Sequence, residues 1–202
     1  AGGMRLVDVG GGRGEFAAMA RENSYATLLI DGNPSNVEHE RRGGHDAKEL
    51  DLNQGLRGLD EASFDCASCL DVIEHIVPSE LLLSEIHRVL KPGGTLILST
   101  PNFGYAKDRV AYLLGHNVRE EGYHFRFFTQ GSLLQKASDA GFRRVGSCSS
   151  ASPLLVRSLV RFLTLGRVQL QPFICPPALE TWLASTFIWK LTKSSPGPHH
   201  IG

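Results

Sequence analysis

A glycine-rich stretch near the amino terminus is the clearest chemical signal in the sequence. The apolar residues 6–9 lead into Gly10, Gly12 and Gly14, and a helical pattern begins at Glu15. Glycine lacks the β-carbon that would hold a ligand away from the backbone, and it tolerates the positive φ angles of a tight turn between strand and helix. Glu15 stands where the dinucleotide fingerprint Gly-x-Gly-x-x-Gly has its last glycine. The spacing therefore favours a pocket for a single nucleoside over one for NAD or FAD.

A carboxylate follows about twenty residues later, at the end of the next apolar run. Asp31 ends the run 26–30, and a crossover through a helix returns such a strand beside the first one. A carboxylate there can accept hydrogen bonds from both hydroxyls of a ribose, and its charge strengthens those bonds. The alternative is a surface aspartate that caps the turn around Asn33.

The wider sequence resembles the class I S-adenosylmethionine-dependent methyltransferases, most strongly over residues 4–102. The motifs stand in the order of that family, and Leu-Lys-Pro-Gly-Gly at 90–94 is the most specific of them. The others are Asp8 with its glycine turn, Asp31, Asp51-Leu52, Phe64-Asp65, Asp71 to Ile76 and Glu85 to Leu90. The stretches 101–104 and 124–129 are more loosely similar to the type 11/12 branch, which includes MetW-type proteins.

The resemblance implies S-adenosylmethionine as cofactor, with S-adenosylhomocysteine as product. It assigns the glycine turn to the methionine and ribose, Asp31 to the ribose hydroxyls, and Asp51 with Leu52 to the adenine. Asp8 would serve the loop or the amino group. The full set of expected cofactor contacts is Asp8, Gly10, Gly11, Gly12, Asp31, Gly32, Asp51, Leu52, Leu70 and Asp71.

Two histidines and, less directly, Glu74 are candidates for a general base, which methyl transfer needs only when the acceptor must lose a proton. His75 follows the fourth strand, where a structural role is the alternative. His124 lies in an aromatic segment with Arg126, which could clasp an anionic or aromatic acceptor. The expected acceptor contacts are Tyr105, Tyr123 and Arg126. Alternatively, the phenylalanines at 125, 127 and 128 fix this segment to the core and Arg126 pairs with a local carboxylate.

The four cysteines give no metal or disulfide framework. Cys66 and Cys69 have a C-x-x-C spacing, but strand alternation points them to opposite faces. We therefore expect free thiols, no metal site and a reducing, cytoplasmic setting, since no cleavable hydrophobic leader is seen.

The hydrophobic pattern predicts an α/β fold with a doubly wound, Rossmann-like sheet. Strands are expected at 4–9, 26–31, before 51, at 64–70, 95–100 and 142–148, and helices from 15, at 35–42, 79–90 and from 129 or 130 to 141. By resemblance the sheet has seven strands, and the last, at 185–191, runs antiparallel between its neighbours. Inserts follow the fifth strand and separate the last two strands.

Residues 1–193 are expected to form one domain, followed by a disordered tail at 194–202. An irregular segment at 103–128 is the candidate substrate lid. The insert at 152–183 is strongly apolar and must bury that surface, as a second lid, as a homodimer contact or against a partner enzyme.

Equal numbers of basic and acidic residues, 21 of each, provide no positive field to recruit nucleic acid. No apolar run is long enough to span a membrane. The leading hypothesis is a cytoplasmic methyltransferase acting on a small molecule, most simply on oxygen. The alternatives are a MetW-like partner protein that activates another biosynthetic enzyme and, with less support, a nucleotide-dependent oxidoreductase.

Overall fold

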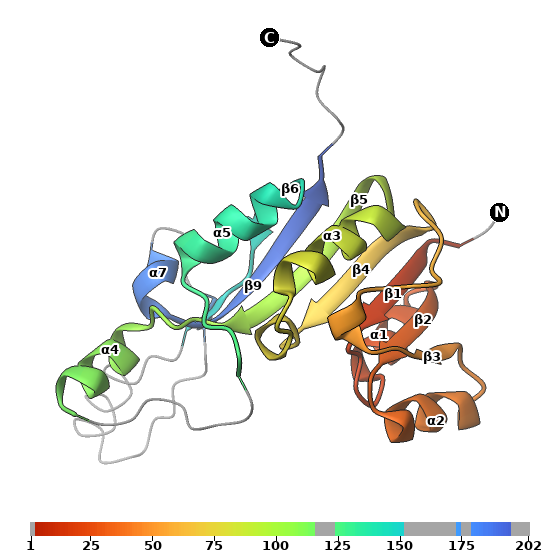
Figure 1. Cartoon of the computed structure of the whole chain (residues 1–202), viewed down its shortest axis with the longest axis horizontal. Coiled ribbons are helices and arrows are strands. Elements are labelled where there is room, and N and C mark those ends of the chain that lie inside the picture. The colour runs from red at the N-terminus through yellow and green to blue at the C-terminus, as the bar shows by residue number, and fades with distance from the viewer. Residues whose placement is uncertain (1–2, 116–123, 152–172, 175–178, 195–202) are drawn as a thin grey trace, which may run out of the picture.

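The computed structural model describes residues 3–115, 124–151, 173–174 and 179–194. Seven strands form a mixed sheet in the order β3-β2-β1-β4-β5-β9-β6 (Figure 1). The first five pair in parallel, whereas β9 is antiparallel to both β5 and β6. The bounds are β1 (Arg5–Val9), β2 (Ala26–Asp31), β3 (Ala47–Glu49), β4 (Phe64–Leu70), β5 (Leu90–Pro101), β6 (Phe142–Ser147) and β9 (Ala184–Lys193). The predicted topology is confirmed.

Helices alternate with the strands, as the sequence predicts. Their bounds are α1 (Glu15–Glu22), α2 (Pro34–Arg42), α3 (Ser79–Val89), α4 (Ala106–Leu113), α5 (Gln130–Asp139) and α7 (Glu180–Leu183), with short 3₁₀ helices η1 (Leu52–Gln54) and η2 (Ile73–His75). Thr129 caps α5 through a reciprocal pair of hydrogen bonds with Ser132. Among the described helices, none has the length and hydrophobicity to cross a bilayer.

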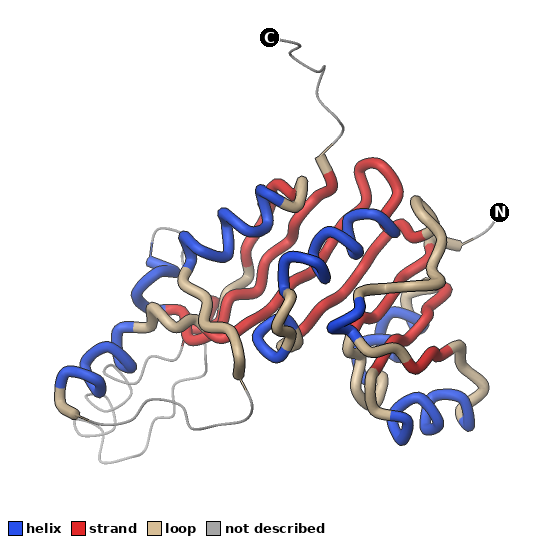
Figure 2. The backbone as a smooth tube through the Cα atoms, in the orientation of Figure 1, coloured by secondary structure: helices blue, strands red, loops and turns tan. Residues whose placement is uncertain are grey.

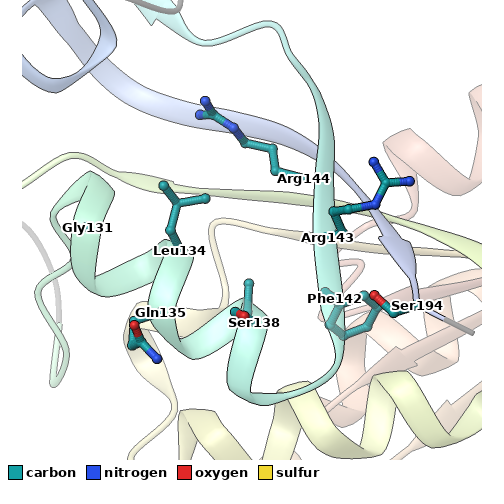
Figure 3. Close-up of a pocket in the computed structure, with 9 residues that line it drawn as sticks. Gly131, Leu134, Gln135, Ser138, Phe142, Arg143, Arg144 and Ser194 are labelled. Carbon is teal, nitrogen blue, oxygen red and sulfur yellow. The ribbon is translucent and has the colours of Figure 1, made fainter. Parts of the chain in front are cut away.

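The two faces of the sheet are covered by different helices. Ile30 belongs to the large core cluster, whereas its neighbour Leu29 packs with Val37 of α2 in a separate small cluster. Successive strand residues point to opposite faces, so the sheet is buried on both sides at this point. Figures 1 and 2 show α3 and α5 lying across one face of the sheet, and both contribute to the large cluster.

A buried asparagine fixes the end of β5. The side-chain amide nitrogen of Asn102 donates to the carbonyl oxygens of Glu180, Thr181 and Ala184 at 3.2, 3.2 and 2.8 Å. Its side-chain oxygen accepts from the backbone N–H of Gly104 at 2.8 Å. Asn102 therefore joins the exit of β5 to α7 and to the start of β9.

The sequence predicts an irregular segment at 103–128. This prediction is wrong in part, because α4 forms within the segment. Residues 106–113 contain neither glycine nor proline, and Asp108 lies in the first turn, where the helix dipole favours a carboxylate. Two further short strands, β7 (Ser150–Ala151) and β8 (Phe173–Ile174), extend the sheet beyond β9. Most of the expected insert 152–183 and almost all of the expected tail lie outside the described residues.

Candidate functional site

The glycine turn after β1 is hydrogen-bonded to the end of β2. The backbone N–H groups of Gly10 and Gly11 donate to the carbonyl oxygen of Ile30 at 2.7 and 3.2 Å. The N–H of Gly12 donates to Oδ2 of Asp31 at 2.9 Å. Gly10 and Gly12 have φ angles of 70° and 56°, in the left-handed region that glycine tolerates. The predicted turn between strand and helix therefore forms, and Asp31 reaches it.

A side chain would meet different surroundings at each glycine of this turn. A β-carbon at Gly10 would lie 2.4 Å from Val72, one at Gly11 would lie 2.6 Å from Oδ2 of Asp8, and one at Gly14 would lie 2.2 Å from Glu40. A β-carbon at Gly12 would have no neighbour within 4 Å. The turn is thus packed against the protein on three sides and open at Gly12, where a ligand can approach the backbone.

The Asp31 carboxylate faces the turn and is only 8% exposed. Its Oδ1 accepts from the backbone N–H of Asn33 at 2.7 Å and from the side chain of Asn36 at 3.2 Å. With Gly12 on Oδ2, three of its roughly four acceptor positions are used. Asp31 is therefore not a surface residue, but its bonds from Asn33 and Asn36 show that it caps the turn after β2, as the alternative interpretation held.

Asp8 lies beneath the glycine turn and is almost fully buried. The Ser68 hydroxyl donates to its Oδ1 at 2.7 Å, while Oδ2 is buried without a hydrogen-bond partner. Burial raises the pKa of Asp8 to about 6, an effect that the bond from Ser68 offsets in part. This oxygen lies beneath Gly11, where a β-carbon would approach it to 2.6 Å, so Asp8 supports the turn from the inside.

The expected adenine contacts occupy different environments. Asp51 is exposed and caps η1 through the N–H of Asn53 at 3.0 Å, a bond that lowers the pKa of Asp51. The side chain of Leu52 belongs to the large core cluster. The Leu52 side chain is therefore turned inward and is not available to an adenine. Gly32 is exposed at the end of β2.

The end of β4 lies at the same edge of the sheet as the glycine turn, because β1 and β4 are parallel neighbours. Leu70 is half-buried, and the exposed Asp71 has a φ angle of 52°. The Ser99 hydroxyl donates to Oδ1 of Asp71 at 2.9 Å, and it accepts from the backbone N–H of Asp71 at 3.0 Å. Val72 packs over Gly10, because its side chain occupies the space that a β-carbon at Gly10 would need. The loop after β4 thus contacts the turn after β1.

His75 and His124 lie together at this edge, with their ring centroids 4.8 Å apart. Both are half-buried beside Glu74, which is buried. The backbone N–H groups of Phe125 and Arg126 donate to the carbonyl oxygen of Glu74 at 2.9 and 3.0 Å. These bonds join the 124–128 segment to η2. The structure thus brings together the two predicted general-base candidates, which stand far apart in the sequence.

The Glu74 side chain was named in the sequence only as a weaker candidate base. Its Oε2 accepts from the Thr100 hydroxyl at 2.9 Å, and burial raises the pKa of its carboxyl. It lines a small pocket with Pro101, Phe103, His124, Arg126 and Phe127. The polar residues that position this site, Ser68, Ser99 and Thr100, were not predicted. Small polar residues within apolar strands were the signal that could have indicated them.

The expected acceptor contacts are less well supported by their surroundings. The Arg126 guanidinium donates to the carbonyl oxygen of Val77 through Nε at 2.8 Å and lies 3.4 Å from the Glu80 carboxylate. This is the local pairing that was weighed as its alternative. Tyr105 is buried at the start of α4, and Tyr123 lies outside the described residues.

The aromatic side chains of the 124–128 segment divide into two groups. Phe128 belongs to the core, whereas Phe125 and Phe127 are 59% and 56% exposed. Phe128 therefore fixes the segment to the core of the protein. Cys66 is half-buried and Cys69 fully buried in β4, and both are free thiols as predicted.

Comparisons with known proteins agree with this geometry. Residues 1–146 match the family model described as a methyltransferase domain. A "probable S-adenosylmethionine-dependent methyltransferase" of Mycolicibacterium smegmatis is 27% identical over 143 residues, which cover 69% of this chain and 52% of that protein. A ubiquinone biosynthesis O-methyltransferase of Xanthomonas oryzae pv. oryzae is 34% identical over 106 residues, which cover 50% and 44%. The chain thus spans about half the length of these relatives.

Solved structures share the fold. A SAM-dependent methyltransferase from Thermotoga maritima superposes with a TM-score of 0.69 at 20% identity, over 94% of this chain and 82% of the other. One from Mesorhizobium loti gives a TM-score of 0.63 at 19% identity, over 95% and 91%. The chain belongs to the methyltransferase domain family, and S-adenosylmethionine is the cofactor that this membership implies.

Proposed function

We propose that this protein transfers the methyl group of S-adenosylmethionine to an oxygen of a small-molecule acceptor. The observation that carries the proposal is the bond from the Gly12 N–H to Asp31, made beside the open side of the glycine turn. Asp31 can turn acceptor positions toward a ribose, and the buried Asp8 supports the glycine turn from beneath. These residues fit the ligand that the family binds.

When bound, S-adenosylmethionine supplies a methyl group on a positively charged sulfur, which is the reactive part of the chemistry. The chain then has to hold the acceptor in line with that group, since positioning supplies much of the acceleration. His75 and His124 lie at the edge where the parallel strands end, and ligands of such sheets bind there. Either imidazole could take the proton that a hydroxyl acceptor loses.

Transfer to oxygen is favoured over transfer to nitrogen by the relatives. Several of them are named as ubiquinone biosynthesis O-methyltransferases. The pocket beside His124 has room only for a water-sized group, and it contains the buried Glu74, whose carboxylate can accept a hydrogen bond from an acceptor hydroxyl placed there.

The proposal is tested by incubating the protein with S-adenosylmethionine and a panel of phenols, vicinal diphenols, carboxylic acids and primary amines. S-adenosylhomocysteine and methylated products are then measured by mass spectrometry. We expect a methyl group on a hydroxyl oxygen. Transfer only to amines would contradict the choice of oxygen, and a failure to bind S-adenosylhomocysteine would contradict the activity itself.

A further inference from the structure

One carboxylate and two imidazoles converge beside the expected methyl donor. Glu74, His75 and His124 each offer one ligand atom, and these atoms all lie within 4.8 Å of one another. We propose that these three residues bind a divalent metal cation, and that this cation holds the hydroxyl oxygen of the methyl acceptor. The first part stands on the cluster alone, and the second rests on the proposed function. The sequence had predicted no metal site.

The spacing suits a cation after a modest contraction. Ligand atoms about 2.0–2.1 Å from a tetrahedral metal lie about 3.3 Å from one another. The three atoms must therefore approach by at most about 1.5 Å, which rotation of the two half-buried histidine side chains can provide. Three protein ligands also leave coordination positions open, as in catalytic metal sites. An open position beside the pocket is what an acceptor oxygen needs.

The cluster is supported from outside, as metal ligands usually are. The Thr100 hydroxyl holds Oε2 of Glu74 from the neighbouring strand β5. The two backbone bonds from Phe125 and Arg126 to the carbonyl oxygen of Glu74 fix the chain next to His124. The fold thus brings His124 to Glu74 and His75, although His124 comes from a distant part of the sequence.

The charges around the cluster favour a cation. Glu74 is 2% exposed, and burial of an ionised carboxylate is costly unless a positive partner compensates it. Arg126 lines the same pocket, but its guanidinium is engaged by Val77 and Glu80 on α3.

A cation here would change how the acceptor loses its proton. A bound cation lowers the pKa of a coordinated hydroxyl, so the proton can leave to solvent before or during transfer. The oxygen lone pair then forms the new bond to the methyl carbon, and the electron pair of the broken carbon–sulfur bond goes to sulfur. The histidines would act as metal ligands and would not need to act as the base.

Binding can be tested with Mn²⁺ followed by electron paramagnetic resonance, in which the signal of the free ion falls as it binds. Mn²⁺ is chosen because it accepts oxygen and nitrogen ligands but has little preference for the cysteine thiols. The reference chain should carry His199→Ala and His200→Ala, because adjacent histidines near the carboxyl terminus could bind the ion themselves.

We expect one Mn²⁺ per chain, and an affinity about tenfold or more lower in His75→Ala and in His124→Ala. His39→Ala, an exposed histidine on α2, is the matched control and should bind as the reference chain does. Circular dichroism and thermal melting confirm that each variant is folded. Absence of a saturable site, or unchanged affinity in both cluster variants, would overturn the metal site.

The role in methyl transfer is tested separately. S-adenosylhomocysteine titrated into His124→Ala should bind within about twofold of the reference chain, so that loss of Mn²⁺ is not mistaken for loss of the cofactor pocket. With an accepted hydroxyl substrate, a chelator should abolish turnover and added Mn²⁺ should restore it. Full turnover in chelator would overturn the acceptor role. Failure of every variant and of the reference chain to bind S-adenosylhomocysteine would instead count against the proposed function.

Discussion

The backbone N–H of Gly12 donates a hydrogen bond of 2.9 Å to the Oδ2 atom of Asp31. This bond joins the turn after β1 to the end of β2 at the edge where the proposed cofactor binds. Asp31 already accepts bonds from Asn33 and Asn36, so a ribose with two hydroxyls must replace at least one of the three. Cofactor binding is therefore expected to rearrange the hydrogen bonds of this carboxylate.

Gly12→Ala is expected to weaken cofactor binding far more than it weakens the fold. A methyl group at Gly12 meets no protein atom within 4 Å, so it would project into the space proposed for the ligand. The positive φ angle costs about 1 kcal/mol for alanine. S-adenosylhomocysteine affinity, measured by calorimetry, should fall by about tenfold or more.

Gly44→Ala is a matched control for that variant. Gly44 has a φ angle of 78° and also no neighbour within 4 Å, but it lies after α2. It should show the same loss of stability and unchanged cofactor affinity. Equal affinities in the two variants would show that the open side of the turn is not the binding surface.

Asp8 should make the fold less stable as pH rises. Burial raises its folded-state pKa from 3.8 to about 6, so the folded protein binds this proton more tightly than the unfolded chain. The protonated Asp8 therefore contributes at most about 3 kcal/mol to the free energy of unfolding. This contribution is fully present below about pH 4 and is lost as pH rises to about 6.

Asp8→Asn removes this titration. The difference in unfolding free energy between Asp8→Asn and the wild type should shift in favour of the variant between about pH 4 and pH 6 and stay constant above about pH 7. Urea denaturation across that range measures it. Parallel stability profiles for the two proteins would show that Asp8 does not titrate in this window.

Asn102→Asp should destabilise the junction of β5, α7 and β9. The substitution places a carboxylate against the three carbonyl oxygens that now accept from the amide. We expect a loss of about 3 kcal/mol or more at pH 7. Since burial raises the pKa of such a carboxyl, the loss should become smaller as pH falls.

Asn102→Ala separates the charge from the lost bonds. It removes these three hydrogen bonds and the one from the Gly104 N–H without adding a charge, and its effect, about 1–3 kcal/mol, should not depend on pH. Thermal melts of both variants at pH 5 and pH 8 give the comparison. A pH-independent loss in Asn102→Asp would show that the carboxylate escapes to water.

Arg126 is expected to stabilise the 124–128 segment and not to bind the acceptor. Its partner Val77 precedes α3, and its partner Glu80 belongs to α3 and also pairs with Lys136. Because these side chains are partly exposed, the coupling between Arg126→Gln and Glu80→Gln should be about 1 kcal/mol or less and should weaken in salt. A large rise in the KM of the acceptor in Arg126→Gln, absent in Glu80→Gln, would contradict this role.

The parts of the fold that the sequence predicts are those with a buried periodic pattern. In α3 four apolar residues recur at helical spacing and are buried, namely Leu82, Leu83, Ile86 and Val89, whereas Leu81 is exposed. In α4 and at its C-cap, Val110, Leu113 and Leu114 also stand at helical spacing, but the structure leaves all three mostly exposed. This short pattern next to Gly115 does not by itself predict a helix, because it lacks the longer run of apolar positions seen in α3.

The candidate site also has residues that the sequence predicts and residues that it does not predict. The glycine turn and Asp31 are local motifs whose types and spacing carry their roles. The meeting of His75 and His124 depends on backbone bonds from the 125–126 segment to Glu74, and no local pattern encodes those bonds. The buried side chain of Leu52 likewise follows from packing, which a two-residue motif cannot show.

The central claim is that Asp31 and the open glycine turn bind the nucleoside of S-adenosylmethionine. Calorimetric titration of S-adenosylhomocysteine into the wild type, Asp31→Ala and Glu38→Ala tests it most directly, because Glu38 is an exposed carboxylate on the adjoining helix α2. We predict saturable binding to the wild type and to Glu38→Ala, and a loss of about tenfold or more in Asp31→Ala. No binding to the wild type, or equal binding to all three folded proteins, would contradict the account.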